Sequence, residues 1–142
     1  ETELHHATCL LFVYGSLRRD SAHAMSAWLA ARAEWLGTAI CREARLVRVS
    51  WYPGLVPGVP GEQVHGDLYR LRDPAGSWPG LDAFEAVTGA PGDEYACRPC
   101  LVMMADGREV QARAYWYRLP VAGLEPVPGG DWLRAEPARP PR

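Results

Sequence analysis

Glycine and proline punctuate this chain at short intervals, and no other feature limits its fold as strongly. Gly (14 residues) and Pro (13 residues) recur between short apolar runs along the 142-residue chain. Their share is above average usage but below that of a low-complexity chain. Because both residues favour turns, the sequence predicts many short elements with short connections. A doubly wound parallel sheet is disfavoured, since each of its crossovers needs a helix.

The amount of apolar material indicates one ordinary globular domain. The sequence is 48% hydrophobic and 23% charged. The hydrophobic share is enough to build a single core. No repeat, linker or second domain is visible. We therefore expect one domain over residues 1–134. Residues 135–142 contain three prolines, and we expect this tail to be disordered.

The order of the expected elements indicates an α+β fold. Two helices are predicted, at 21–33 with Ser21 as N-cap and at 79–88, and residues 51–58 read as a loop. The remaining apolar runs read as strands, and the last two form a hairpin that turns at 105–107. These strands are expected at 9–14, 35–42, 44–49, 63–71, 95–104 and 109–117. The sheet is expected to be antiparallel or mixed, and it could close into a barrel.

Charge and hydropathy exclude some kinds of partner. The net charge is −2 and no window concentrates basic residues, so nucleic acid is not expected as a partner. The longest apolar stretch, 9–14, is far shorter than the roughly 20 residues that span a bilayer. The start, Glu1-Thr2-Glu3, lacks the basic segment of a signal peptide, unless processing has removed one. We expect a cytoplasmic protein with no membrane partner.

Four cysteines allow two functional readings and a structural one. Cys97 and Cys100 have the spacing of a redox pair or of half a zinc site. No second paired spacing supplies two more zinc ligands, so no metal is expected. A redox pair should open a helix, but residues 95–104 read as a strand, where positions three apart face opposite sides. We therefore expect structural cysteines.

The turn after the first expected strand is a candidate binding loop. It contains Tyr14, Gly15, Ser16 and Leu17. A glycine at this point lets successive backbone N–H groups converge, which makes a concavity for an anion. A plain tight turn explains the same residues. The residues alone leave both interpretations open.

Glu85 is a candidate acid/base residue on the second expected helix. It follows Leu81 by one turn, at the edge of the apolar face and on the flank of Trp78. Partial desolvation there should raise the carboxyl pKa toward neutrality. The alternative is a solvated or Arg-paired glutamate at the helix border. Asp82 is expected on the exposed side.

Seven short motifs, in order, resemble the gamma-glutamyl cyclotransferase-like family. Each motif is weak by itself, but their order and spacing over about residues 9–133 make a specific signal. They are LFVYGSL at 11–17, YPGLV at 52–56, VHGDLY at 64–69, LDAFE at 81–85, Tyr95 with Arg98, AYWY at 114–117 and GDW at 130–132.

The resemblance implies a compact α+β fold around a small β-barrel, with a loop and a glutamate facing one cavity. Tyr14, Gly15, Ser16 and Leu17 would hold the substrate's α-carboxylate, and Glu85 would be the catalytic acid/base. Tyr95 and Tyr117 match positions that line the cavity, although aromatic core is an equally good account of each. The implied reaction cyclises a γ-glutamyl amine or amino acid to 5-oxoproline and releases the amine, with no cofactor or metal.

Two departures from the family pattern concern the pocket. The family's glycine after the catalytic glutamate is Ala86 here, and Arg18-Arg19-Asp20-Ser21 lacks the usual Arg-x-Gly and Asn. These differences bear on substrate choice more than on chemistry. The competing hypothesis is a non-catalytic binding or regulatory module that keeps the pocket without turnover.

Overall fold

A computed structural model describes residues 9–21 and 23–135 of the chain. Apart from Ala135, the expected tail at 135–142 lies outside the described residues. The elements, in chain order, are β1 (Leu10–Val13), α2 (Ala24–Arg32), β2 (Ala33–Arg42), β3 (Ala44–Arg48), β4 (Pro53–Pro57), β5 (Gln63–Leu71), α3 (Pro74–Phe84), β6 (Tyr95–Met104), β7 (Glu109–Tyr117), β8 (Glu125–Pro126) and the 3-10 turn η1 (Pro128–Gly130).

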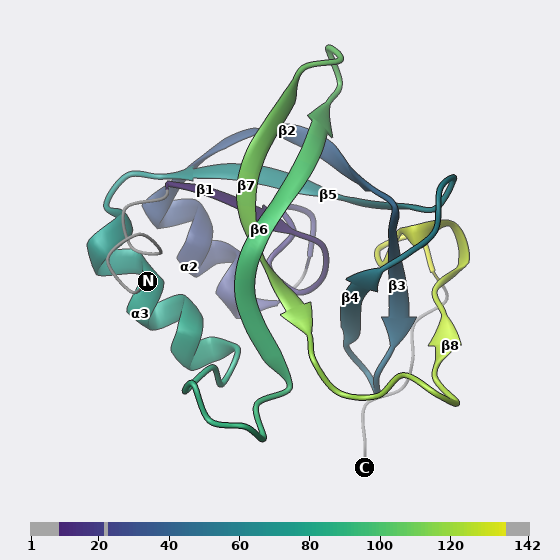
Figure 1. Cartoon of the computed structure of the whole chain (residues 1–142). Helices are drawn as coiled ribbons and strands as arrows, with labels where there is room; N and C mark the ends of the chain where they lie inside the picture. Colours follow the sequence, from purple (N-terminus) through teal and green to yellow (C-terminus); the bar gives the residue numbers. More distant parts are fainter. Residues whose placement is uncertain (1–8, 22, 136–142) are drawn as a thin grey trace.

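Five strands close into a small barrel (Figure 1). Neighbouring strands run antiparallel in the order β1, β5, β2, β6 and β7, and β7 then meets β1 in parallel, with Leu11 opposite Arg113. The sheet is therefore mixed and the fold is α+β, as the sequence predicts. Closure leaves fewer strand edges open to water.

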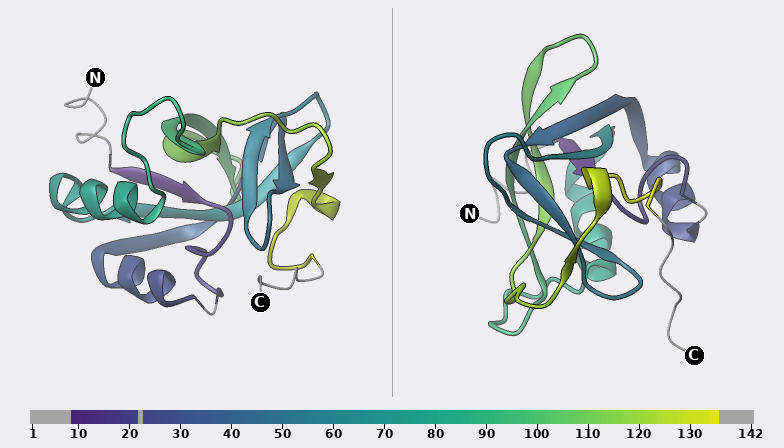
Figure 2. Two further views of the ribbon diagram at one scale, coloured as in Figure 1. Left: turned by 90° about the horizontal axis from the view of Figure 1, so that it is seen from below. Right: turned by 90° about the vertical axis from the view of Figure 1, so that its right-hand side faces the viewer.

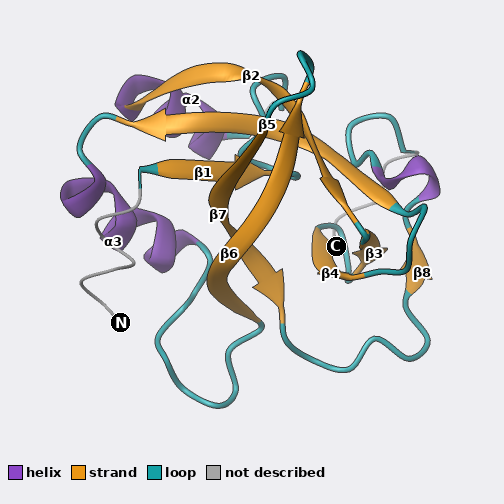
Figure 3. Cartoon of the chain, turned by 45° about the horizontal axis from the view of Figure 1, so that its top comes forward, coloured by secondary structure: helices purple, strands orange, loops and turns teal. Residues whose placement is uncertain are grey.

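A second group of strands extends the barrel on one side. β4 pairs in parallel with β7 through Leu55 and Trp116, β3 pairs antiparallel with β4, and β8 adds a short edge. Figures 1 and 2 show β3, β4 and β8 on one side of the barrel and both helices on the other, and Figure 3 shows the same division by element type. One side of the barrel is therefore covered by strands and the other by helices.

Strand alternation divides the core into two clusters. On β1, Phe12 packs in one cluster, which fills the barrel and continues under β3 and β4. Its neighbours Leu11 and Val13 pack in the other cluster, with Leu29 of α2 and Leu81 of α3. Successive side chains of a strand point to opposite faces, so β1 serves both clusters at once. Gly66 on β5 has no room for a Cβ, which would overlap the Phe12 ring and the Val13 carbonyl.

Several element boundaries differ from the sequence-based expectation, including the start of β2, which is Ala33 instead of Trp35. Helix α2 begins at Ala24, and its N-cap is His23 instead of Ser21. Residues 51–58, expected as a loop, contain strand β4. Helix α3 spans Pro74–Phe84 instead of 79–88, because Asp73 caps its N-terminus and Pro74 occupies the first turn, where a missing N–H costs nothing.

The pairing of strand β6 accounts for the position of its proline and for the sides that its two cysteines face. It pairs with β7 along its length but with β2 only from Val102 to Met104, so Pro99 lies where the other side of the strand is unpaired. Cys100 packs in the barrel cluster and Cys97 against the helix cluster. The two thiols thus face opposite sides of the strand, as the spacing predicts, and both are free.

Among the residues that the structure describes, no helix has the length and apolar character needed to cross a bilayer.

Candidate active site

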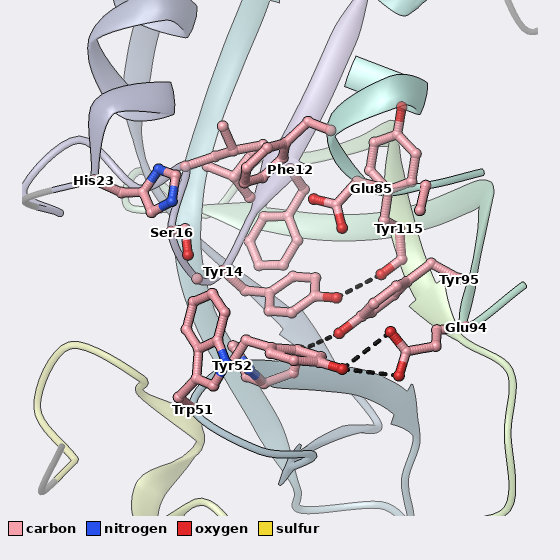
Figure 4. Close-up of a pocket in the computed structure, with 16 residues that line it drawn as sticks. Phe12, Tyr14, Ser16, His23, Trp51, Tyr52, Glu85, Glu94, Tyr95 and Tyr115 are labelled. Carbon is pink, nitrogen blue, oxygen red and sulfur yellow. Dashed lines mark hydrogen bonds between the residues drawn. The ribbon is translucent and has the colours of Figure 1, made fainter. Parts of the chain in front are cut away.

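A cavity of about 260 Å³ opens beyond the end of β1. Its wall combines the turn after β1, the segment around β4, the end of α3 and the starts of β6 and α2 (Figure 4). The lining residues are Phe12, Val13, Tyr14, Gly15, Ser16, Leu17, His23, Trp51, Tyr52, Pro53, Phe84, Glu85, Ala86, Glu94, Tyr95 and Tyr115. The structure therefore brings the candidate loop and Glu85 to one cavity.

The turn at residues 14–17 lines this cavity. Its geometry is set by the Arg18 N–H, which donates to the Gly15 carbonyl at 3.0 Å. Within the described part of the chain, the N–H groups of Ser16 and Leu17 have no hydrogen-bond acceptor. Adjacent free N–H groups in a turn suit an anion. A Cβ at Gly15 would lie 3.0 Å from the Pro53 ring, so a larger residue there would require the ring to shift.

Buried ionic contacts fix this turn from behind. The Arg18 guanidinium donates to Asp67 on β5 at 3.3 Å and to Asp131 at 2.9 Å. Asp67 also accepts from the Arg19 N–H at 2.9 Å, so one carboxylate holds two successive loop residues. Both arginine contacts are largely shielded from solvent, where charge-assisted hydrogen bonds are strong.

Glu85 lies at the end of α3 rather than within it. It is the C-cap residue, and its N–H donates to the Leu81 carbonyl at 3.0 Å. Ala86 follows with φ 56°, and Val87 donates to the Asp82 carbonyl at 2.8 Å. This left-handed residue turns the chain out of the helix and leaves the Glu85 side chain in the cavity wall. Figure 4 shows Glu85 on one side of the cavity, with Ser16 and His23 on the other.

The surroundings of Glu85 favour its neutral form. Burial raises its pKa from 4.5 to about 7, and the negative charges of Asp82 and Glu94 add to the effect. The direction agrees with the sequence-based expectation. A carboxyl with this pKa can take and return a proton near neutral pH.

The expected exposure of Asp82 is wrong. Its carboxylate accepts a hydrogen bond from the Tyr115 hydroxyl at 2.6 Å and is partly buried. The helix begins five residues earlier than expected, and Asp82 lies beside β7 in the packed structure. Asp82 therefore takes part in setting the pKa of Glu85.

Tyrosines form much of the remaining wall, and their hydroxyl groups already donate hydrogen bonds to acceptors within the protein. Tyr14 donates to the Tyr115 carbonyl and Tyr95 to the Pro53 carbonyl, both at 2.6 Å. Burial raises the pKa of both phenols well above the ordinary value. These rings are therefore neutral donors that hold the wall together.

Tyr117 is not among the lining residues, unlike the other expected site residues. It lies opposite Tyr95 on the neighbouring strand, with ring centroids 5.6 Å apart in an edge-on arrangement. Its Cβ and Cγ also leave no space for a side chain at Gly54. Tyr117 thus supports the Tyr95 ring from outside the cavity.

Sequence reasoning missed several lining residues. Tyr52 and Tyr115 lie within recognised motifs without being assigned to the site, and Glu94 directly precedes Tyr95. The Tyr52 hydroxyl shares its one proton in a bifurcated hydrogen bond with the two Glu94 oxygens, at 3.0 and 2.8 Å. His23 carries no signal for the site, because only the fold brings the start of α2 to it.

The remaining candidates for chemistry are a cluster of metal ligands and the Cys97 thiol. Within residues 9–21 and 23–135, no group of three or more His, Cys, Asp or Glu side chains could hold a metal ion. Burial raises the pKa of the Cys97 thiol to about 12, which opposes thiolate formation.

Comparison with known proteins gives a family and several solved structures. Residues 11–134 match the family model described as gamma-glutamyl cyclotransferase, AIG2-like. No curated protein sequence matches the chain. The solution structure of protein ytfP from Escherichia coli is 34% identical, with a TM-score of 0.59 over 88% of this chain and 96% of that one.

Two further structures share the fold. An AIG2-like protein of Mus musculus is 23% identical, with a TM-score of 0.67 over 95% of this chain and 99% of that chain. A structure titled gamma-glutamyl cyclotransferase is 19% identical, with a TM-score of 0.60 over 85% of this chain and 72% of that one.

Proposed function

Because this chain belongs to the gamma-glutamyl cyclotransferase, AIG2-like family, we propose that it cyclises a γ-glutamyl compound to 5-oxoproline and releases an amine. The observation that carries the proposal is that Glu85, with a pKa of about 7, shares one cavity with the turn at residues 14–17. The cavity thus offers a proton acceptor and an anion site to the same small molecule.

The turn would anchor the substrate's α-carboxylate. The N–H groups of Ser16 and Leu17 are suited to an anion, and the contacts of Arg18 with Asp67 and Asp131 keep the turn in place before substrate arrives. An anchored carboxylate limits how the γ-glutamyl chain can fold. The α-nitrogen and the γ-carbonyl then meet within one molecule, which removes much of the entropic barrier to ring closure.

Glu85 would move the protons of the reaction. An α-ammonium is not nucleophilic, so the ionised carboxylate first takes a proton from it. The amine attacks the γ-carbonyl carbon and forms the ring C–N bond, and the protonated Glu85 gives its proton to the leaving nitrogen as the old C–N bond breaks. The ring nitrogen then loses its extra proton to Glu85, which passes it to the released amine. A pKa near the working pH suits both directions of transfer.

The burial of Glu85 supports its role as the acid/base residue over the alternative of a solvated surface glutamate. A surface glutamate of ordinary pKa would remain ionised at neutral pH and would be a poor proton donor. Burial and two nearby carboxylates shift Glu85 toward the value that the two-way transfer needs. The tyrosine hydroxyls of the wall donate to protein acceptors, so they position the site while Glu85 carries protons.

Mass-spectrometric detection of 5-oxoproline tests the proposal. We expect product from at least one member of a panel of γ-glutamyl amines and amino acids. Glu85→Gln keeps the shape of the side chain but cannot accept the proton, so the rate should fall on the order of 10²–10⁴-fold. Glu125→Gln, an equivalent change at an exposed residue, should retain the rate.

Two results would count against the proposal. Substrate binding without 5-oxoproline from any compound would favour the non-catalytic module. Full activity in Glu85→Gln, with the fold verified by circular dichroism, would remove Glu85 from the chemistry.

A further inference from the structure

The cavity holds one basic side chain among the described residues that line it, the imidazole of His23. His23 is the N-cap of α2, and its Nδ1 accepts a hydrogen bond from the Met25 N–H at 3.0 Å. A ring nitrogen that accepts a hydrogen bond carries no proton, so the ring is neutral and its proton is on Nε2. The helix cap therefore makes Nε2 the donor nitrogen of His23.

The Nε2–H group of His23 has no acceptor in the part of the chain that the structure describes. The other contacts of this residue hold it in place. Its backbone N–H donates to the Ser21 hydroxyl at 3.1 Å, and its ring packs edge-on against Phe84, with ring centroids 5.4 Å apart. An N–H donor without an acceptor in a cavity wall is suited to bind an acceptor atom of a ligand.

His23 and the turn at residues 14–17 belong to one connected part of the wall. Figure 4 shows His23 and Ser16 on the same side of the cavity. The Ser26 hydroxyl, in the first turn of α2, donates to the Arg18 carbonyl at 2.9 Å, and this contact is buried. The start of α2 is therefore bonded directly to the segment that forms the candidate anion site.

We propose that the Nε2–H of His23 donates a hydrogen bond to the substrate's α-carboxylate, and that His23 thereby selects compounds that carry this carboxylate. The inference rests on the proposed function, which assigns the carboxylate to the N–H groups of Ser16 and Leu17. A carboxylate accepts about four hydrogen bonds, so the turn leaves a place for a third donor. Hydrogen bonds to an ionised acceptor are stronger than neutral ones. A carboxamide in the same place would be a weaker acceptor, and its NH2 group would meet N–H donors.

Two substitutions separate the roles of the two ring nitrogens. The Oδ1 atom of asparagine takes the place of Nδ1, so His23→Asn keeps the helix cap but loses the donor at Nε2. The amide nitrogen of glutamine takes the place of the imidazole Nε2, so His23→Gln keeps a donor but loses the cap. His65→Asn is the matched control, because His65 lies on β5 and outside the cavity lining.

Binding of 5-oxoproline, the proposed product, measures the selection without turnover. Its neutral counterpart is 5-oxoprolinamide, in which a carboxamide replaces the carboxylate. In calorimetric titrations, His23→Asn should weaken the binding of 5-oxoproline about tenfold and that of 5-oxoprolinamide much less. His65→Asn should leave both Kd values unchanged. His23→Gln should keep most of the preference for the carboxylate, while the midpoint of its urea unfolding falls.

Steady-state kinetics with a γ-glutamyl amide give a second readout. His23→Asn should raise KM about tenfold and leave kcat nearly unchanged, since it removes a bond that ground state and transition state share. Figure 4 shows His23 across the cavity from Glu85, which would carry the protons.

Turnover and binding can fail independently. If no γ-glutamyl compound yields 5-oxoproline but His23→Asn weakens 5-oxoproline binding as expected, the proposed function fails and the inference stands. Three results would overturn the inference: no binding of 5-oxoproline to the wild-type protein, an unchanged Kd in His23→Asn, or an equal loss of affinity for both ligands.

Discussion

Glu85 shows how a residue at a helix end obtains a pKa that the same residue would lack in solution. Its backbone closes α3, and its side chain lies in the cavity wall, where burial and the negative charges of Asp82 and Glu94 raise its pKa. The sequence allowed the raised pKa to be predicted, because the apolar neighbours of Glu85 in α3 are visible in it. The contribution of Asp82 could not be predicted, since its contact with Tyr115 joins residues 33 positions apart.

The pH dependence of activity should report this environment. Glu85 must be ionised to take a proton from the substrate, so kcat/KM should rise with pH and reach half its plateau near pH 7. Asp82→Asn removes a negative charge that raises the Glu85 pKa, and the midpoint should move to lower pH. Rates measured from pH 5 to pH 9 test both expectations.

Asp106→Asn is the control for that shift. Asp106 is exposed in the turn between β6 and β7, where it pairs with Arg108. Its loss should leave the midpoint in place. A wild-type midpoint near the ordinary glutamate value of 4.5 would contradict the assigned environment of Glu85.

At the scale of elements, the end of α3 contains a backbone conformation that lowers the stability of the folded protein. Ala86 has φ 56°, a left-handed conformation in which a Cβ is unfavourable. Glycine adopts it without that penalty. Ala86→Gly should therefore stabilise the protein by about 1 kcal/mol in urea denaturation.

Ala83→Gly is a matched test of this explanation. Ala83 lies three residues earlier, inside α3, and is exposed. The same substitution there should destabilise the protein by about 1 kcal/mol, because a helical glycine loses more backbone freedom than alanine. Opposite signs for the two variants support the left-handed cap, whereas a loss of stability in both would contradict it.

Other elements show which boundaries a sequence can specify. The ranges of β5, β6 and β7 agree with their apolar patterns, since each lies between clear turn signals. The sequence predicts a loop at strand β4 because Pro53, Gly54 and Pro57 are typical of turns. Its pairing with the adjacent β3 and with β7 decides its conformation, and β7 comes from a distant segment of the chain. The start of α3 had a local signal, Asp73 before Pro74, that the apolar pattern around Glu85 obscured.

At the scale of the whole molecule, the C-terminal segment secures the turn after β1. Asp131 meets Arg18, 113 positions earlier, and the nearby Gly130 packs so closely on β5 that a Cβ would overlap the Gln63 carbonyl. The sequence motifs at 11–17 and 130–132 predict that these two segments belong to the same fold. The ion pair itself could not be predicted, because each partner is charged and unremarkable in its own stretch of sequence.

Asp131→Asn should affect stability and binding together. The variant leaves a buried guanidinium with a weaker partner, which should cost about 1–3 kcal/mol of unfolding free energy. A less restrained turn should also raise KM severalfold with a smaller change in kcat. Urea denaturation and steady-state kinetics measure the two effects, and Asp106→Asn should change neither. Lost stability with an unchanged KM would show that the ion pair does not position the turn.

The closure of the barrel also determines when this protein can become functional during synthesis. β1 is synthesised before its parallel neighbour β7, and the Tyr14 hydroxyl finds its acceptor 101 residues later, on Tyr115. Such distant pairings form slowly compared with local ones. Until β7 has been made, the nascent chain carries β1 with an open edge and a cavity without one wall. The site is therefore completed only after β7 has been made.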